Sequence, residues 1–168
     1  IANVFWNHRM FLMNGDSKYI DVLERTLYNA VLPGISFEGN TFFYPNVLEF
    51  NGKDPFNQGA TGRKPWFDCS CCPSNLSRFI PAVPNYIYAQ KENEIFANLF
   101  VANKTRFTAN KHEFQIEQET RYPWEGNIKF KFKSENPVKF NFKIRVPGWA
   151  VNKPVPGDLY AYMDEPVK

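Results

Sequence analysis

Residues 69–75 read C-S-C-C-P-S-N, and this short stretch lies where the pattern of the chain changes. Before it, apolar residues recur at helical spacing, and after it apolar and polar residues alternate as they do in strands. Pro73 suits the first position of a helix, where its missing N–H costs nothing. We therefore expect a short helix from Pro73 to about Ile80, with Cys72 near its N-cap and Cys71 just outside it.

The chain before this stretch is predicted to be mainly helical. Apolar residues over 2–14 and 17–32 fit two helices separated by a glycine turn. Residues 35–44 carry a hairpin signal, and residues 51–65 form a long loop rich in Gly, Pro and Asn. Two helices alone cannot bury both of their faces, so they indicate a larger helical body.

The chain after this stretch is predicted to form strands. Apolar residues alternate with polar ones, often lysine, over residues 86–90, 94–101, 112–118, 127–133 and 138–146. This alternation favours half-buried antiparallel strands with one solvated face, and a site for a polyanion is the alternative interpretation. The predicted fold class is therefore mixed α and β, with a helical part over 1–85 and a β part over 86–168.

Composition excludes several classes of protein. The 168 residues carry a net charge of +3 with the charges interspersed, which argues against a nucleic-acid partner. An apolar content of 43% argues against global disorder, and no apolar run approaches the roughly 20 residues that a membrane helix needs. Aromatic residues make up 17% of the chain, which fits either a β-rich core or a site for flat ligands or sugars.

The three cysteines, Cys69, Cys71 and Cys72, indicate a chemical site. Their odd number and close spacing argue against a disulfide framework, because adjacent cysteines rarely bridge each other. The cluster indicates a metal or a reactive thiolate, and a set of buried reduced thiols is the alternative. Zinc takes about four ligands, and His8 and His112 lie far from the cluster in sequence. At least one ligand would therefore come from a distant residue or from outside this chain.

The cysteine stretch at 69–75 resembles the C-x-C-C-P-P-N signature of glycoside hydrolase family 127, the β-L-arabinofuranosidases. Residues 21–29 look like the family's helix after a Glu-Thr-Cys motif, and residues 42–49 look like its F-F-Y-x-N-P-L-E hairpin. Residues 122–124 and 144–149 look like strands of its β-sandwich. The resemblance therefore extends along most of the chain.

This resemblance implies the C-terminal part of an (α/α)6 catalytic barrel over 1–85 and an antiparallel β-sandwich over 86–168. It also implies a zinc ion held by three cysteines and one glutamate. Cys71 matches the family's nucleophile, which is also a zinc ligand, and Cys72 matches a second ligand. Cys69 matches a cysteine that is not a ligand, so we expect a structural role for it.

Other parts of the family's site have no match in this sequence. The remaining cysteine and glutamate ligands and the acid/base glutamate are expected before Ile1, so we expect the isolated chain to be inactive. A zinc-dependent retaining glycosidase that releases L-arabinofuranose from a plant-type glycan is the function implied. Non-catalytic metal-binding and carbohydrate-binding modules are the alternatives to this function. The sequence does not decide between the bacterial cytoplasm and the periplasm as the location of the protein.

Three further residues are candidates for binding the sugar. Tyr44 and Asn46 lie on the predicted hairpin, and Trp66 precedes the cysteine cluster. A tyrosine offers a ring and a hydroxyl, and a tryptophan offers a flat surface for stacking on a sugar ring. A core position for Tyr44 and simple packing for Trp66 are the alternative interpretations.

Overall fold

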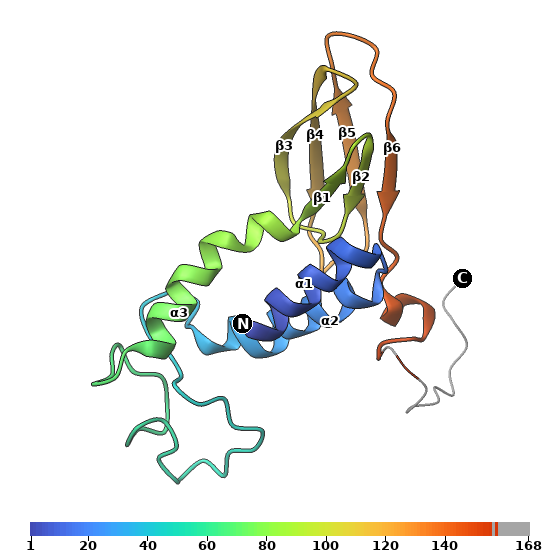
Figure 1. Ribbon diagram of the computed structural model, residues 1–168. Coiled ribbons are helices and arrows are strands. Elements are labelled where there is room, and N and C mark those ends of the chain that lie inside the picture. Colours follow the sequence, from blue (N-terminus) through green and yellow to red (C-terminus); the bar gives the residue numbers. More distant parts are fainter. Residues whose placement is uncertain (156, 158–168) are drawn as a thin grey trace. The chain divides into compact units, whose positions relative to one another are not determined.

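The computed structural model describes residues 1–155 and 157, so residue 156 and the end of the predicted β part after 157 lie outside the described residues. The chain divides into two compact units, Ile1–Val83 and a second that begins at Pro84 (Figure 1). Within the described part, no helix has both the length and the apolar character needed to cross a membrane. Each unit is considered by itself below.

The first unit begins with the two predicted helices. Helix α1 covers Ala2–Asn14 and ends at Gly15, whose positive φ of 70° gives the left-handed turn that glycine adopts without strain. Helix α2 covers Lys18–Thr26, and the chain continues through a π-helical turn, η1 (Leu27–Val31), and a 3-10 turn, η2 (Leu32–Gly34). The two helices pack together. The buried apolar residues of this segment are Val4, Phe11, Ile20, Leu23, Leu27 and Val31.

The segment predicted as a hairpin is tied together by isolated bridges rather than by a ladder. Phe42 pairs with Ile35 on one side and with Lys64 on the other. The predicted loop at 51–65 contains no helix or strand. These bridges bring the loop back against the Phe42 segment just before the chain enters the cysteine cluster.

Helix α3 covers Cys71–Phe79 and is followed by the 3-10 segment η3, Ile80–Tyr86. The prediction that Cys71 lies outside the helix is wrong, because Ser70 is the N-cap and Cys71 and Cys72 are the first two helical residues. Pro73 is therefore the third residue of the helix. The first four N–H groups of a helix have no intrahelical partner, so proline fits anywhere in the first turn and does not fix the starting residue.

Up to residue 155 and at 157, the second unit shows six strands in two sheets (Figure 1). One sheet has the order β1-β2-β6 and the other has the order β3-β4-β5. All pairs are antiparallel except β2 with β6, which is parallel. The strands are β1 Tyr88–Lys91, β2 Glu94–Ala97, β3 Asn103–Ala109, β4 His112–Thr120, β5 Ile128–Lys133 and β6 Asn141–Ile144.

Two features of the sheets differ from the prediction. Strand β3 was not predicted, and β6, within the predicted strand 138–146, does not pair antiparallel with a neighbour. Alternation of apolar and polar residues indicates which face a side chain occupies, but it carries no information on strand direction. Strand β6 follows β5 in the chain but joins the other sheet, beside β2. The direction of β6 relative to β2 therefore depends on how the chain crosses from one sheet to the other.

Side chains from both sheets form one hydrophobic core. Its buried members are Ile95, Ala109, Phe114 and Ile116, and the partly buried residues packed against them are Tyr88, Phe107, Phe130, Val138, Phe140 and Phe142. The opposite face of β3-β4-β5 carries ion pairs: Lys104 lies 2.9 Å from Glu117, and Lys131 pairs with Glu119. Because these lysines have acidic partners, the ion pairs favour a solvated sheet surface over a site for a polyanion.

Candidate active site

The cysteine sulfurs gather at the start of helix α3. Cys71 and Cys69 are exposed, whereas Cys72 is partly buried. The Sγ atoms of Cys71 and Cys72 lie 3.8 Å apart. The N-terminal end of a helix carries a partial positive charge, so it favours the thiolate form of a cysteine placed there.

Tyr44 is the predicted sugar-binding residue that the fold brings to this cluster. Its hydroxyl lies 3.0 Å from the Sγ of Cys71, across 27 positions of sequence. Its ring lies 5.5 Å, centroid to centroid, from the ring of buried Phe67. A tyrosine hydroxyl at this distance donates a hydrogen bond to the sulfur once the thiol has lost its proton.

The contact between Tyr44 and Cys71 changes the acidity of both groups. The hydrogen bond with Tyr44 is the largest cause that lowers the pKa of Cys71, followed by bonds with Cys69 and Cys72. The same contact raises the pKa of the Tyr44 hydroxyl, so this group keeps its proton. Burial raises the pKa of Cys72. Of the two adjacent cysteines, Cys71 is therefore the one whose thiolate form its surroundings favour.

Asn57 was not among the predicted site residues. Its side-chain oxygen accepts a hydrogen bond of 2.8 Å from the backbone N–H of Tyr44. It lies in a loop rich in Gly, Pro and Asn, where asparagine is an ordinary turn residue. The sequence therefore offered no signal that separates this asparagine from its neighbours.

The other two predicted sugar-binding residues have different surroundings. The side-chain nitrogen of Asn46 donates a bond of 2.8 Å to the carbonyl of Ala30, within the π-helical turn η1. Trp66 is 57% exposed. The structure thus places Tyr44 directly on the cysteine cluster, ties Asn46 to η1 and leaves the indole of Trp66 open to solvent.

The spacing of two sulfurs fits a zinc ion. Tetrahedral zinc with Zn–S bonds of about 2.3 Å holds two sulfurs about 3.8 Å apart. The Sγ atoms of Cys71 and Cys72 have that separation. In residues 1–155 and 157, no group of three or more His, Cys, Asp and Glu side chains is arranged to hold a metal. This part of the chain therefore offers two sulfurs of suitable spacing rather than a full set of four ligands.

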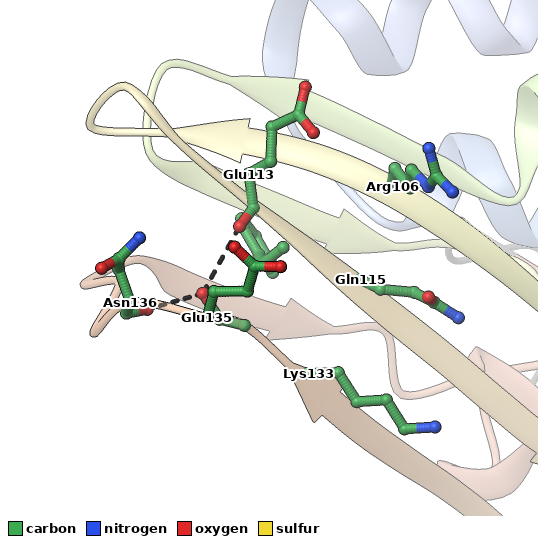
Figure 2. Close-up of a pocket in the computed structure, with 8 residues that line it drawn as sticks. Arg106, Glu113, Gln115, Lys133, Glu135 and Asn136 are labelled. Atoms are coloured by element: carbon green, nitrogen blue, oxygen red, sulfur yellow. Dashed lines mark hydrogen bonds between the residues drawn. The ribbon is translucent and has the colours of Figure 1, made fainter.

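A small hollow lies beside the cluster, and a larger one lies in the second unit. The first, of about 180 Å³, is lined by Gln58, Lys64, Phe67, Asp68 and Cys69. The second, of about 420 Å³, lies at β3, β4 and the segment after β5 (Figure 2) and is lined by Arg106, Glu113, Phe114, Gln115, Lys133, Ser134, Glu135 and Asn136. Its lining includes two glutamates but no cysteine, so of these two hollows the first is the one that borders the sulfur cluster.

Comparison with known sequences identifies the family. The profile of the beta-L-arabinofuranosidase GH127 catalytic domain matches residues 1–85. The chain belongs to glycoside hydrolase family 127. The profile of the GH127 middle domain matches residues 94–157, so the family assignment extends into both units.

Individual relatives agree with the family 127 assignment. The non-reducing end beta-L-arabinofuranosidase of Bifidobacterium longum subsp. longum is 30% identical over 159 residues, which cover 89% of this chain and 24% of that protein. A solved GH127 beta-arabinofuranosidase superposes with a TM-score of 0.87 at 50% identity, covering 96% of this chain and 24% of that one. A solved GH127 beta-L-arabinofuranosidase from Geobacillus stearothermophilus T6 gives a TM-score of 0.79 at 37% identity, and the match covers 89% of this chain and 24% of that one.

The family 127 chain thus spans about a quarter of the length of these relatives. Its mixed α and β fold, with a few helices and mainly antiparallel sheets, is similar to that of the solved family members.

Proposed function

We propose that this chain carries the nucleophile of a zinc-dependent retaining β-L-arabinofuranosidase, and that the nucleophile is Cys71. The observation that carries the proposal is the 3.0 Å contact between the Tyr44 hydroxyl and the Cys71 sulfur at the start of α3. Membership of family 127 supports a glycoside hydrolase, and the match to its catalytic domain favours an enzyme over a binding module.

In the proposed reaction, the Cys71 thiolate attacks the anomeric carbon of the sugar. A C1–S bond forms while the bond from C1 to the leaving oxygen breaks, and a general acid protonates that oxygen. Resemblance to the family assigns the acid to a glutamate that has no match in this sequence. Water then attacks C1 while the conjugate base of that acid takes its proton. The C1–S bond breaks and the thiolate is restored, so two inversions give net retention.

The residues of this chain prepare the sulfur for that attack. The Tyr44 hydroxyl donates a hydrogen bond to the Cys71 thiolate. This bond fixes the direction in which the lone pairs of the sulfur point. The hydrogen bond and the helix N-terminus both favour the charged form of Cys71. Both effects act before substrate binds, so they preorganise the nucleophile.

We further propose that Cys71 and Cys72 are zinc ligands, which the 3.8 Å separation of their sulfurs supports. A bound zinc ion would keep both sulfurs ionised at neutral pH. Such a site needs two more ligands, which the family resemblance assigns to a cysteine and a glutamate outside this sequence.

The substrate in this proposal is a β-linked L-arabinofuranosyl group of an arabinose-containing glycan of plant type. Tyr44 lies at the sulfur, Asn46 keeps its side-chain oxygen as an acceptor for a sugar hydroxyl, and exposed Trp66 offers a stacking surface. We further propose, from the family resemblance, that the first unit is the C-terminal part of an (α/α)6 barrel and the second a β-sandwich, and the fold similarity to solved family 127 members is consistent with this.

The experiment that tests the nucleophile is the Cys71→Ala variant of the full-length protein. We expect hydrolysis of an activated arabinofuranoside to fall at least about a thousandfold, because the covalent step is lost. Cys69→Ser is the matched control, since Cys69 lies in the same cluster and is not the proposed nucleophile, and serine keeps a group that can hydrogen-bond to Cys71. An inhibitor that traps the covalent intermediate should add its mass at Cys71. Full activity of Cys71→Ala, or an adduct on a carboxylate, would refute the assignment.

A further inference from the structure

A buried asparagine connects the Tyr44 segment to the loop that follows it. The Asn57 side chain has no solvent exposure, and its amide makes three hydrogen bonds. Its oxygen accepts from the Tyr44 N–H at 2.8 Å, and its nitrogen donates to the carbonyls of Phe42 and Gly62 at 3.1 and 2.8 Å. Its own backbone exchanges two bonds with Ala60. The protein itself therefore supplies the hydrogen-bond partners of the Asn57 amide.

The Asn57 amide takes the place of a residue in a neighbouring strand. It bonds to the carbonyl of Phe42 and to the N–H of Tyr44, the two residues on either side of Phe43. A residue in a parallel strand makes the same two bonds with its backbone. The bridges of this segment end at Phe42, and Tyr44 belongs to no strand, so the side chain continues a pairing that the backbone does not.

Two contacts therefore restrain the backbone and the ring of Tyr44, the parts that carry its hydroxyl. Asn57 holds the backbone N–H, and the ring packs against buried Phe67 with centroids 5.5 Å apart. We propose that Asn57 is a positioning residue that holds the Tyr44 hydroxyl on the Cys71 sulfur. This inference rests on the proposed function, because Asn57 affects the reaction only if the Tyr44–Cys71 contact does.

Removal of the Asn57 amide would leave two backbone groups without their partner, the Tyr44 N–H and the Gly62 carbonyl, whereas the Phe42 carbonyl would still accept a bond of 3.0 Å from the Lys64 N–H. Buried polar groups without partners are unfavourable, so these segments would move to find new ones. A displacement of about 1 Å is enough to cost much of a catalytic contact. Such a displacement would disturb the 3.0 Å hydrogen bond from the Tyr44 hydroxyl to the Cys71 sulfur.

A double-mutant cycle in the full-length protein tests the proposal. The variants are Asn57→Ala, Tyr44→Phe and the two combined, and the measurement is kcat and KM on an aryl β-L-arabinofuranoside. We expect Asn57→Ala to lower kcat about tenfold when Tyr44 is present and less than twofold in the Tyr44→Phe background. Two residues that act through one hydroxyl give such a non-additive result, whereas a general loss of structure lowers kcat equally in both backgrounds.

Asn51→Ala is the matched control, because Asn51 is an exposed asparagine of the same loop that bonds only to Lys53 and Asp54. It should leave kcat unchanged. If Asn57→Ala does not fold by circular dichroism, the cycle uses Asn57→Asp, which keeps an acceptor for the Tyr44 N–H. Failure of both variants to fold means that Asn57 has only a structural role and overturns the proposal.

Equal losses in the two backgrounds, or no loss in Asn57→Ala, also overturn the proposal. These results differ from a failure of the proposed function. In that case Cys71→Ala and Tyr44→Phe would both retain full activity, whatever the effect of Asn57.

Discussion

At the scale of single residues, the neighbours of each sulfur decide which of the two adjacent cysteines ionises more readily. Cys71 and Cys72 are adjacent on one helix, yet their pKa values move in opposite directions. Tyr44 donates to the first, and burial opposes ionisation of the second. The pair is therefore asymmetric before any substrate or metal is bound.

The Tyr44→Phe variant should shift the titration of Cys71 toward higher pH. The hydrogen bond from Tyr44 lowers the pKa of Cys71, so its removal raises that pKa and leaves less thiolate at neutral pH. The measurement is the rate of alkylation at Cys71 against pH in metal-free full-length protein, followed by mass spectrometry. Tyr19→Phe, a tyrosine on α2, is the control and should not move the profile. An unchanged profile in Tyr44→Phe would contradict the contact.

Variants of Asn46 should separate its two polar atoms. Its nitrogen bonds to the Ala30 carbonyl, and we propose that its oxygen accepts from the sugar. Asn46→Asp loses only the donor, so we expect stability to fall by about 1 kcal/mol with little change in KM. Asn46→Ala loses both atoms, so KM should rise as well. Equal KM values in the two variants and the wild type would exclude a role in sugar binding.

At the scale of elements, alternation along strand β4 (His112–Thr120) separates a buried face from a charged face. Phe114 and Ile116 belong to the core, while Glu117 and Glu119 pair with lysines on the other face. This strand lies at the centre of its sheet, between β3 and β5. Packing on one face and ion pairs on the other make its register unambiguous.

The Ile116→Ala variant should destabilise the second unit strongly. Ile116 has no solvent exposure, and truncation of such a residue leaves a cavity that typically costs about 2–5 kcal/mol. Gln115→Ala, one position earlier on the outward face, should change stability by less than about 0.5 kcal/mol. Chemical denaturation followed by circular dichroism measures both. Similar losses for the two variants would contradict the assignment of faces.

Periodicity predicted the elements whose apolar residues recur regularly, such as α1 and β5. It missed β3 (Asn103–Ala109), because Phe107 is the one large apolar side chain in a strand otherwise made of polar and small residues. It also could not place Asn57, whose importance depends on contacts with Tyr44 and Gly62 rather than on its neighbours in sequence. Tyr44 was predicted to bind the sugar, but its contact with Cys71 was not predicted, because 27 positions of sequence separate the two residues.

At the scale of the whole molecule, the proposed chemistry needs groups that the family resemblance assigns to residues without a match in this sequence. The chain spans about a quarter of its relatives and offers two sulfurs with the spacing of zinc ligands. The two units match the catalytic and middle domains of the family. The proposed metal site is therefore a property of the full-length protein.

Zinc content should distinguish the cysteines of the full-length protein. We expect Cys72→Ser to lose most of its bound zinc, because a tetrahedral site loses one of its sulfurs. Cys69→Ser should keep it, since the family resemblance gives Cys69 no place among the ligands. Elemental analysis after dialysis measures the ratio of zinc to protein. Retention in Cys72→Ser, or equal loss in both variants, would refute the proposed ligand set.

The parallel pairing of β2 with β6 also constrains the order of folding. Strands β3, β4 and β5 are consecutive in sequence and pair with their neighbours, so they close short loops. Strand β6 returns to β2 across all of them, and the entropic cost of closing that long loop is offset only when Phe142 and its neighbours pack against the core. We therefore expect the local pairings, the β1–β2 hairpin and the β3-β4-β5 meander, to form before β6 docks on β2.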